Sequence, residues 1–103
     1  MSDLKEKPNL SLLQQKRAEI LAIAQKHGAK NVRIFGSVAR GEADEDSDID
    51  FLIDYDLDKI SPWFPAGLLL DLEGLLGFRV DVVTERGLKP RIKERVIKEA
   101  IAL

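Results

Sequence analysis

Residues 36–50 read GSVARGEADEDSDID, and this stretch decides how the rest of the chain is interpreted. It ends in two aspartates, Asp48 and Asp50, separated by one apolar residue. On an extended strand, side chains alternate between the two faces, so both carboxylates point the same way. Ile49 and Phe51 then point into a core. The pattern predicts a strand that buries one face and carries two carboxylates on the other.

The two carboxylates and the glycine–serine step before them predict a site for a metal and a nucleotide. Adjacent carboxylates repel each other unless a cation lies between them. Magnesium suits such a pair because it binds carboxylate oxygens together with substrate phosphates. Gly36 and Ser37 follow a strand-like segment, where a turn offers a backbone N–H and a hydroxyl to phosphate oxygens.

Turn residues and hydrophobic periodicity divide the chain into alternating helices and strands. We expect a flexible tail at residues 1–8 and a single domain at residues 9–103. The predicted elements are a helix from residue 9 or 11 to 28, a strand at 31–35, a helical turn at 37–40, a strand at 48–55, a helix at 61–77, a strand at 79–84 and a helix from 90 that includes Ile101. The order α-β-α-β-α-β-α predicts an α/β (α+β) domain with a small mixed sheet flanked by helices.

Size, charge and cysteine content narrow the class of protein. The chain has 103 residues, which fits one domain, and 45% of them are hydrophobic, which is enough for one core. Its net charge of −2 argues against a nonspecific nucleic-acid binder. Cysteine is absent, the first residues contain no apolar signal segment, and Asp71 and Glu73 interrupt the apolar stretch at 66–76. We therefore expect a soluble cytoplasmic protein that does not enter a membrane.

A third acid lies on the strand predicted at residues 79–84. Asp81 stands between two valines, and a carboxylate in a small core is costly unless it is paired or bound to metal. One interpretation is a salt bridge to Arg33, Arg79 or another basic residue. The other is a third ligand beside Asp48 and Asp50.

Other ligand-binding motifs fail on spacing. A phosphate-binding P-loop requires lysine where Glu42 stands. A calcium-binding EF-hand loop starting at Asp44 requires glycine where Ile49 stands and glutamate where Tyr55 stands. A zinc site is not supported, because the chain has no cysteine and a single histidine, His27, for which we expect a role at a helix C-terminus or plain solvent contact.

Gly36-Ser37, ten intervening residues and Asp48-Ile49-Asp50 form a GSx10DxD signature. With Ala39-Arg40-Gly41 and Ser47, this segment resembles the minimal nucleotidyltransferases of the DNA polymerase β-like superfamily. The segment 79–103, with its strand aspartate and its helix after Lys-Pro, also resembles the end of those domains. The resemblance covers the chain from about residue 31 onward and implies a nucleotidyltransferase-like fold.

The resemblance also implies roles for individual residues. Asp48, Asp50 and Asp81 would be the catalytic, metal-holding acids for a pair of Mg²⁺ ions, and Gly36 and Ser37 would contact the phosphates of ATP.

Arg40 lies close to these residues in the sequence, and its planar fork matches phosphate oxygens. It has an alternative role as a partner of the acidic loop beside it.

Two functions from different classes follow. Family members of this size are often paired with a helical HEPN partner, a ribonuclease toxin, and some transfer AMP from ATP to a tyrosine of that toxin. The first hypothesis is therefore an enzyme, an antitoxin that adenylylates its partner. The second is a non-catalytic antitoxin that masks the partner. Transfer to a small-molecule acceptor is a further alternative, which the short chain disfavours because little of it remains to build an acceptor pocket.

Two surfaces are candidates for partner contacts. In the helix predicted at residues 61–77, Trp63, Phe64, Leu69 and Leu70 fall outside the face expected to pack on the core. Such excess apolar surface indicates a protein interface, unless the sheet and the first helix cover both sides. The last helix carries a basic face, which suits either solvent or a negatively charged partner. This face consists of Arg91, Arg95 and Lys98.

Overall fold

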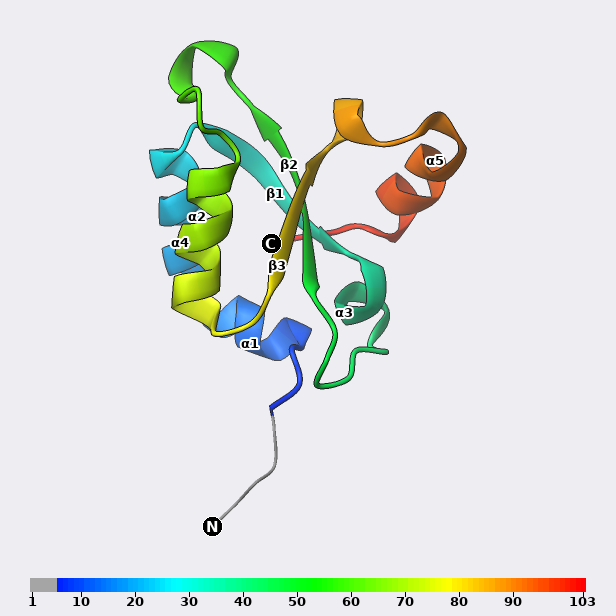
Figure 1. Cartoon of the computed structure of the whole chain (residues 1–103). Helices are drawn as coiled ribbons and strands as arrows, with labels where there is room; N and C mark the ends of the chain where they lie inside the picture. The colour runs from blue at the N-terminus through cyan, green and yellow to red at the C-terminus, as the bar shows by residue number, and fades with distance from the viewer. Residues whose placement is uncertain (1–5) are drawn as a thin grey trace.

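The computed structural model describes residues 6–103, which form a four-stranded mixed sheet with helices on both faces (Figure 1). The strands are β1 (Ala29–Phe35), β2 (Ile49–Tyr55), β3 (Val80–Thr84) and β4 (Ile101–Ala102), in the order β3-β2-β1-β4. Strand β2 runs parallel to β3 and antiparallel to β1, and β4 runs antiparallel to β1. The helices are α1 (Leu10–Gln15), α2 (Arg17–Lys26), α3 (Gly36–Arg40), α4 (Ala66–Leu76) and α5 (Pro90–Glu99), with short 3₁₀ turns at η1 (Leu57–Lys59) and η2 (Glu85–Gly87). The predicted fold class is confirmed.

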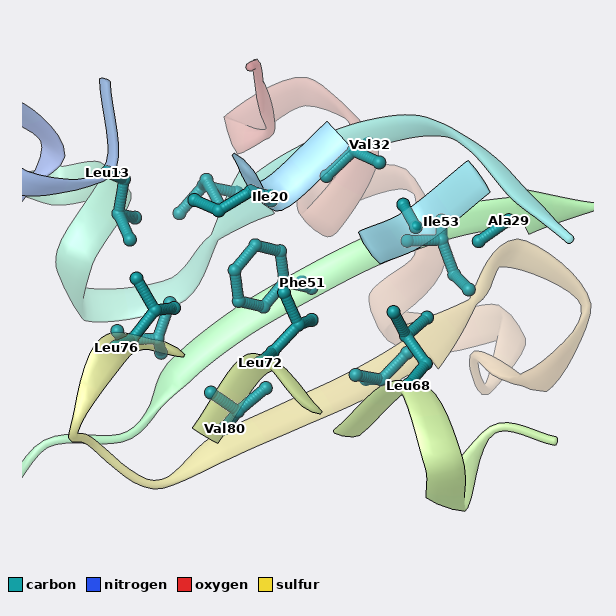
Figure 2. Close-up of a cluster of buried hydrophobic side chains, with 14 of the residues drawn as sticks. Leu13, Ile20, Ala29, Val32, Phe51, Ile53, Leu68, Leu72, Leu76 and Val80 are labelled. Atoms are coloured by element: carbon teal, nitrogen blue, oxygen red, sulfur yellow. The ribbon is translucent and has the colours of Figure 1, made fainter. Parts of the chain in front are cut away.

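The main core lies between the sheet and the pair α2 and α4, which run side by side over one face (Figure 1). Phe51 of β2 is fully buried at the centre of this core, among Ile20 of α2 and Leu72 of α4 (Figure 2). Ile49 is also fully buried, so the predicted inward face of this strand is confirmed. Helix α5 lies on the other face of the sheet, where Val96 is buried.

The first helix is divided, which the sequence pattern did not predict. Helix α1 begins after Asn9, whose side chain accepts a hydrogen bond of 2.9 Å from the backbone N–H of Leu12. It ends at Lys16, where the backbone leaves helical geometry before α2 begins. Leu13 and Ile20, one from each helix, are both fully buried. The break therefore lets both segments pack on one core.

The end of the last helix was predicted wrongly. Helix α5 ends at Glu99, and Ala100 already has extended backbone angles. Ile101 and Ala102 then pair with Ile34 and Arg33 as strand β4. Pairing with β1 satisfies backbone groups that would otherwise lie at a free sheet edge, and this long-range gain outweighs the local helical pattern.

The helix predicted from Ser61 begins later, at Ala66. The hydroxyl of Ser61 accepts a hydrogen bond of 3.2 Å from the backbone N–H of Trp63, which holds the segment in a turn. Pro65 immediately precedes α4, and Gly77 ends the helix in the left-handed conformation, as its position after the helical pattern predicts. The first and third strands are also shifted by one or two residues from their predicted starts.

The predicted tail at residues 1–8 lies largely outside the described residues. Of the part that the structure describes, Pro8 is buried. Within residues 6–103, no helix has both the length and the apolar character that crossing a bilayer requires.

Candidate active site

The strand topology places the two ends of the GSx10DxD segment side by side. Because β1 and β2 are antiparallel, the end of β1 lies beside the start of β2, and Phe35 pairs with Asp50. Because β2 and β3 are parallel, the start of β2 also lies beside the start of β3, and Asp50 pairs with Asp81. Asp48 comes immediately before β2. The three aspartates therefore lie at one edge of the sheet, beside the glycine–serine step.

The electrostatics of Asp50 reflect this crowding. Its pKa rises from 3.8 to about 6, first because the carboxyl is half-buried and then because Asp81, Asp48 and Glu99 are negatively charged neighbours. Arg40 acts in the opposite direction and lowers this pKa without cancelling the rise. A raised carboxyl pKa beside further acids is typical of functional sites, because catalytic acids and bases need pKa values matched to their task.

Gly36 is required at this position by its surroundings. Its φ of +75° lies in the left-handed region. A Cβ atom built on it would overlap Oδ2 of Asp50. Only a residue without a side chain can bring the backbone this close to the carboxylate. The glycine therefore sets the distance between the turn that opens α3 and the first acid of β2.

Arg40 is held by two acids. Its Nη1 donates to Oε1 of Glu99 at 2.7 Å, and its Nε donates to Oε1 of Glu42 at 2.9 Å. The pairing with the acidic loop beside it is thus present, as the alternative interpretation expected. The pairing with Glu99 was not expected, because it joins residues 59 positions apart. A phosphate contact by Arg40 stays a prediction.

Asp48 and Asp81 differ in their partners. Nε of Arg79 forms a salt bridge of 3.0 Å to Oδ1 of Asp48, and Nη2 of Arg79 donates to the carbonyl of Asp46 at 2.7 Å. The salt bridge considered for Asp81 is not formed within residues 6–103, where Arg33 pairs instead with Asp54 and Glu85. The side chain of Asp81 is exposed at the edge of β3.

The donor set of this edge fits magnesium in kind. Three carboxylates supply oxygen ligands only, which a hard divalent cation prefers. A cation there would also relieve the repulsion that raises the pKa of Asp50. Within residues 6–103, however, no three acidic or histidine side chains are grouped closely enough to hold a metal as they stand. Asp48 pairs with Arg79 in this arrangement.

Two further residues have structural partners. Ser47 Oγ accepts a hydrogen bond of 2.9 Å from the backbone N–H of Asp44, and so organises the acidic loop. His27 Nε2 lies 2.6 Å from Oδ2 of Asp71, which ties α2 to α4. His27 lies at the end of α2, where the sequence placed it, but its contact with α4 was not expected. Ser47 directly precedes Asp48, whereas His27 precedes the start of β1, at the opposite end of that strand from Gly36.

Comparison with known proteins agrees with this geometry. A family model described as a nucleotidyltransferase domain matches residues 17–103. A relative from Methanocaldococcus jannaschii, provisionally named a protein adenylyltransferase, is 41% identical over 85 residues, which cover 82% of this chain and 90% of the relative. The protein adenylyltransferase MntA of Thermococcus cleftensis is 38% identical over 81 residues, covering 77% of this chain and 79% of that protein.

Solved structures show the same fold. A structure provisionally named a minimal nucleotidyltransferase is 51% identical, covers 93% of this chain and 97% of that chain, and has a TM-score of 0.81. A crystal structure of a toxin–antitoxin pair with AMP-PNP contains a chain with a TM-score of 0.68 and 21% identity, a match that covers 82% of this chain and 69% of that one. At that identity the second match supports the fold alone. The resemblance stated from the sequence is confirmed: the chain belongs to the nucleotidyltransferase domain family and is a transferase of the minimal type.

Proposed function

We propose that this chain transfers AMP from ATP to a tyrosine hydroxyl of a partner protein, and that it does so with Mg²⁺ at the edge formed by Asp48, Asp50 and Asp81. The observation that carries the proposal is the in-register pairing of Asp50 with Asp81, with Gly36 packed against the first of them. Two relatives with names of protein adenylyltransferases support the choice of a protein acceptor.

The reaction forms a bond between the acceptor oxygen and the α-phosphorus of ATP and breaks the bond to pyrophosphate. When bound, magnesium would offset negative charge on the phosphates. The chain's own groups would orient the substrate: the Gly36 N–H, the Ser37 hydroxyl and the Arg40 fork as donors to phosphate oxygens. Asp81 is exposed at the edge of β3, where its carboxylate could accept the proton of the attacking hydroxyl.

The acceptor would come from another chain, for which a helical HEPN-type toxin is the proposed partner. The fold is shared with chains of toxin–antitoxin crystal structures, which motivates this choice. In the segment at residues 61–77, fewer apolar side chains are exposed than the sequence predicts. Trp63 is 79% exposed and Leu70 is 64% exposed, whereas Phe64 and Leu69 pack partly against the core. We place the contact at Trp63 and Leu70, and the reaction in the cytoplasm, where ATP is supplied.

The transfer is tested with ATP labelled at either end of the triphosphate. The chain is incubated with magnesium and the proposed helical partner, once with α-labelled and once with γ-labelled ATP. Label from the α position should appear on the partner and map to a tyrosine by mass spectrometry, while label from the γ position should not. Label from the γ position alone would mean phosphoryl transfer and contradict the proposal.

A second function, masking of the partner without chemistry, is favoured by the exposure of Trp63 and Leu70. The two functions make opposite predictions in a neutralisation assay. If masking is the activity, Trp63→Ala with Leu70→Ala abolishes neutralisation and Asp48→Asn with Asp50→Asn leaves it intact. If transfer is the activity, the aspartate variant fails to neutralise although it still binds the partner.

A further inference from the structure

One acid outside the GSx10DxD segment reaches into the candidate site. Glu99 is the last residue of α5, and its carboxylate accepts two hydrogen bonds from the start and end of α3. Oε2 accepts from the backbone N–H of Gly36 at 2.7 Å, and Oε1 accepts from Nη1 of Arg40 at 2.7 Å. The Glu99 side chain is only 17% exposed, so this is a defined contact and not a loose surface pair.

The two donors that Glu99 holds are those assigned above to phosphate oxygens. A carboxylate and a phosphate present the same kind of acceptor to a backbone N–H and a guanidinium. The N–H of Gly36 carries a single hydrogen and cannot serve both acceptors at full strength. We propose that Glu99 occupies the phosphate-binding donors in the nucleotide-free protein, and that ATP binds by displacing it. This inference rests on the nucleotide site proposed above.

Charge supports displacement over coexistence. The site already holds Asp48, Asp50 and Asp81, and Glu99 adds a negative charge that Asp50 senses. A triphosphate brings several more negative charges to the same donors. Retaining Glu99 there would set like charges against each other in a partly buried position, which is unfavourable.

The surroundings of Glu99 offer it another position. Its hydrogen-bond partners lie on α3. Against the effect of burial, the hydrogen bonds from Arg40 and Gly36 lower the pKa of Glu99, and Arg95, one turn earlier on α5, lowers it further. A shallow concavity beside the site is lined by Arg91, Glu94, Arg95, Lys98 and Glu99. The released carboxylate can therefore pair with Arg95 without unfolding α5. The basic face of α5 would then hold the released Glu99 carboxylate.

A purely structural clamp predicts the opposite result. If Glu99 only ties α5 to α3, removing its charge loosens Gly36 and Arg40 and weakens nucleotide binding. If Glu99 competes with phosphate, removing its charge strengthens nucleotide binding. The sign of one change in affinity separates the two roles.

The test compares Glu99→Gln with Glu94→Gln, a matched change on the same helix at an exposed residue that pairs only with Lys98 among residues 6–103. The dissociation constant of AMP-PNP with magnesium is measured by calorimetry for both variants and the unchanged chain. Glu99→Gln should bind about tenfold more tightly, because a neutral amide competes more weakly than a carboxylate for the Gly36 N–H and the Arg40 guanidinium. Glu94→Gln should stay within about twofold. Unchanged or weaker binding by Glu99→Gln, with a normal thermal melt, overturns the inference.

A measurement on the unchanged chain covers the case in which Glu99→Gln does not fold. The side-chain carboxyl ¹³C signals of Glu99 and Glu94 are followed by NMR during titration with AMP-PNP and magnesium. The Glu99 signal should move towards that of Glu94 as the nucleotide saturates. A Glu99 signal that stays fixed while the Gly36 amide shifts overturns the inference. If the unchanged chain and both variants bind no nucleotide, the proposed function fails instead.

Discussion

Strand β2 carries an Asp-x-Asp step at each end, and the two steps lie in opposite environments. At its start, Asp50 faces other acids, and its pKa is raised to about 6. At its end, Asp54 and Asp56 face cations. Nη2 of Arg33 lies 3.2 Å from Asp54, and Nζ of Lys30 lies 2.7 Å from Asp56, whose pKa is lowered chiefly by that hydrogen bond.

Cross-strand neighbours create this difference. Asp54 pairs across the sheet with Lys30 of β1, whereas Asp50 pairs with Phe35 on one side and Asp81 on the other. Two identical sequence patterns thus become a pair that cations neutralise at one end and, at the other end, a step in which Asp48 pairs with Arg79 while Asp50 faces acids. An Asp-x-Asp step marks a cation site only where the neighbouring strands leave it uncompensated.

The largest expected effect comes from making the same double substitution in each of the two Asp-x-Asp steps and comparing the rates of AMP transfer. Asp48→Asn with Asp50→Asn should lower the rate of AMP transfer by about 100- to 1000-fold, because the acids that would hold magnesium are lost. Asp54→Asn with Asp56→Asn should leave the rate within about twofold, since those acids are satisfied by cations away from the site. Single-turnover transfer to the partner measures both. Equal losses in the two variants would remove the distinction between the ends of β2.

A smaller effect is expected at the glycine that fits against Asp50. Gly36→Ala should destabilise the fold by about 2–3 kcal/mol and slow transfer by about 100-fold, because the new methyl group displaces the carboxylate. Gly77 is a matched control, with the same φ of +75° and nothing within 4 Å of an added Cβ. Gly77→Ala should cost about 1 kcal/mol from backbone strain and leave the rate unchanged. Denaturant melts and the transfer assay give the two quantities. Equal rate losses in both variants would mean that the close approach to Asp50 is irrelevant.

The smallest expected effect is on stability, which should change in opposite directions when an aspartate is replaced at the start or at the end of β2. The folded pKa of Asp50, about 6, lies above its unfolded value of 3.8, so the wild-type chain loses stability as the pH rises between these values. Without divalent cations, Asp50→Asn should therefore be more stable than wild type above pH 6. The gain should be about 1–2 kcal/mol, less than the full shift implies because the carboxyl is only half-buried, and it should vanish below about pH 4.

Asp56→Asn is the control for this pH dependence. The pKa of Asp56 is lowered, so its pairing stabilises the fold above pH 3.8 and is lost as the pH falls through the folded pKa. Its replacement should slightly destabilise the chain at neutral pH, because the pair with Lys30 is exposed. Urea melts from pH 3 to pH 8 follow both variants. A stabilising Asp56→Asn or a destabilising Asp50→Asn at pH 7 would contradict the assignment of environments.

The sequence allowed the fold class and most elements to be predicted, because the local patterns agree with the tertiary structure. The alternation around Ile49 and Phe51 predicts a strand with a buried face, and both residues are fully buried. Strand β4 could not be predicted, because Ile101 continues the apolar pattern of α5 and only the free edge of β1 makes it a strand. Long-range pairing of this kind has no local signal.

The same limit applies to the candidate site. Type and spacing predict a role for the three aspartates and Gly36, and the strand order brings them to one edge of the sheet. The clamp of Glu99 on Gly36 and Arg40 could not, because the residues are 63 and 59 positions apart and Glu99 lies on a helix with no distinctive pattern. The salt bridge between Arg79 and Asp48 also joins residues far apart in the sequence. The sequence suggested Arg79 as a partner for Asp81 instead.

The most direct test of the account asks which end of β2 takes a divalent cation together with a nucleotide. Mn²⁺, which shares the oxygen preference of Mg²⁺, is titrated into the ¹⁵N-labelled chain with AMP-PNP, and paramagnetic broadening of backbone amides is recorded by NMR. The account predicts that the amides of Gly36, Asp48, Asp50 and Asp81 broaden first, while those of Lys30, Asp54 and Asp56 stay sharp. Broadening centred on Asp54 and Asp56, or an unaffected Asp81, would contradict it.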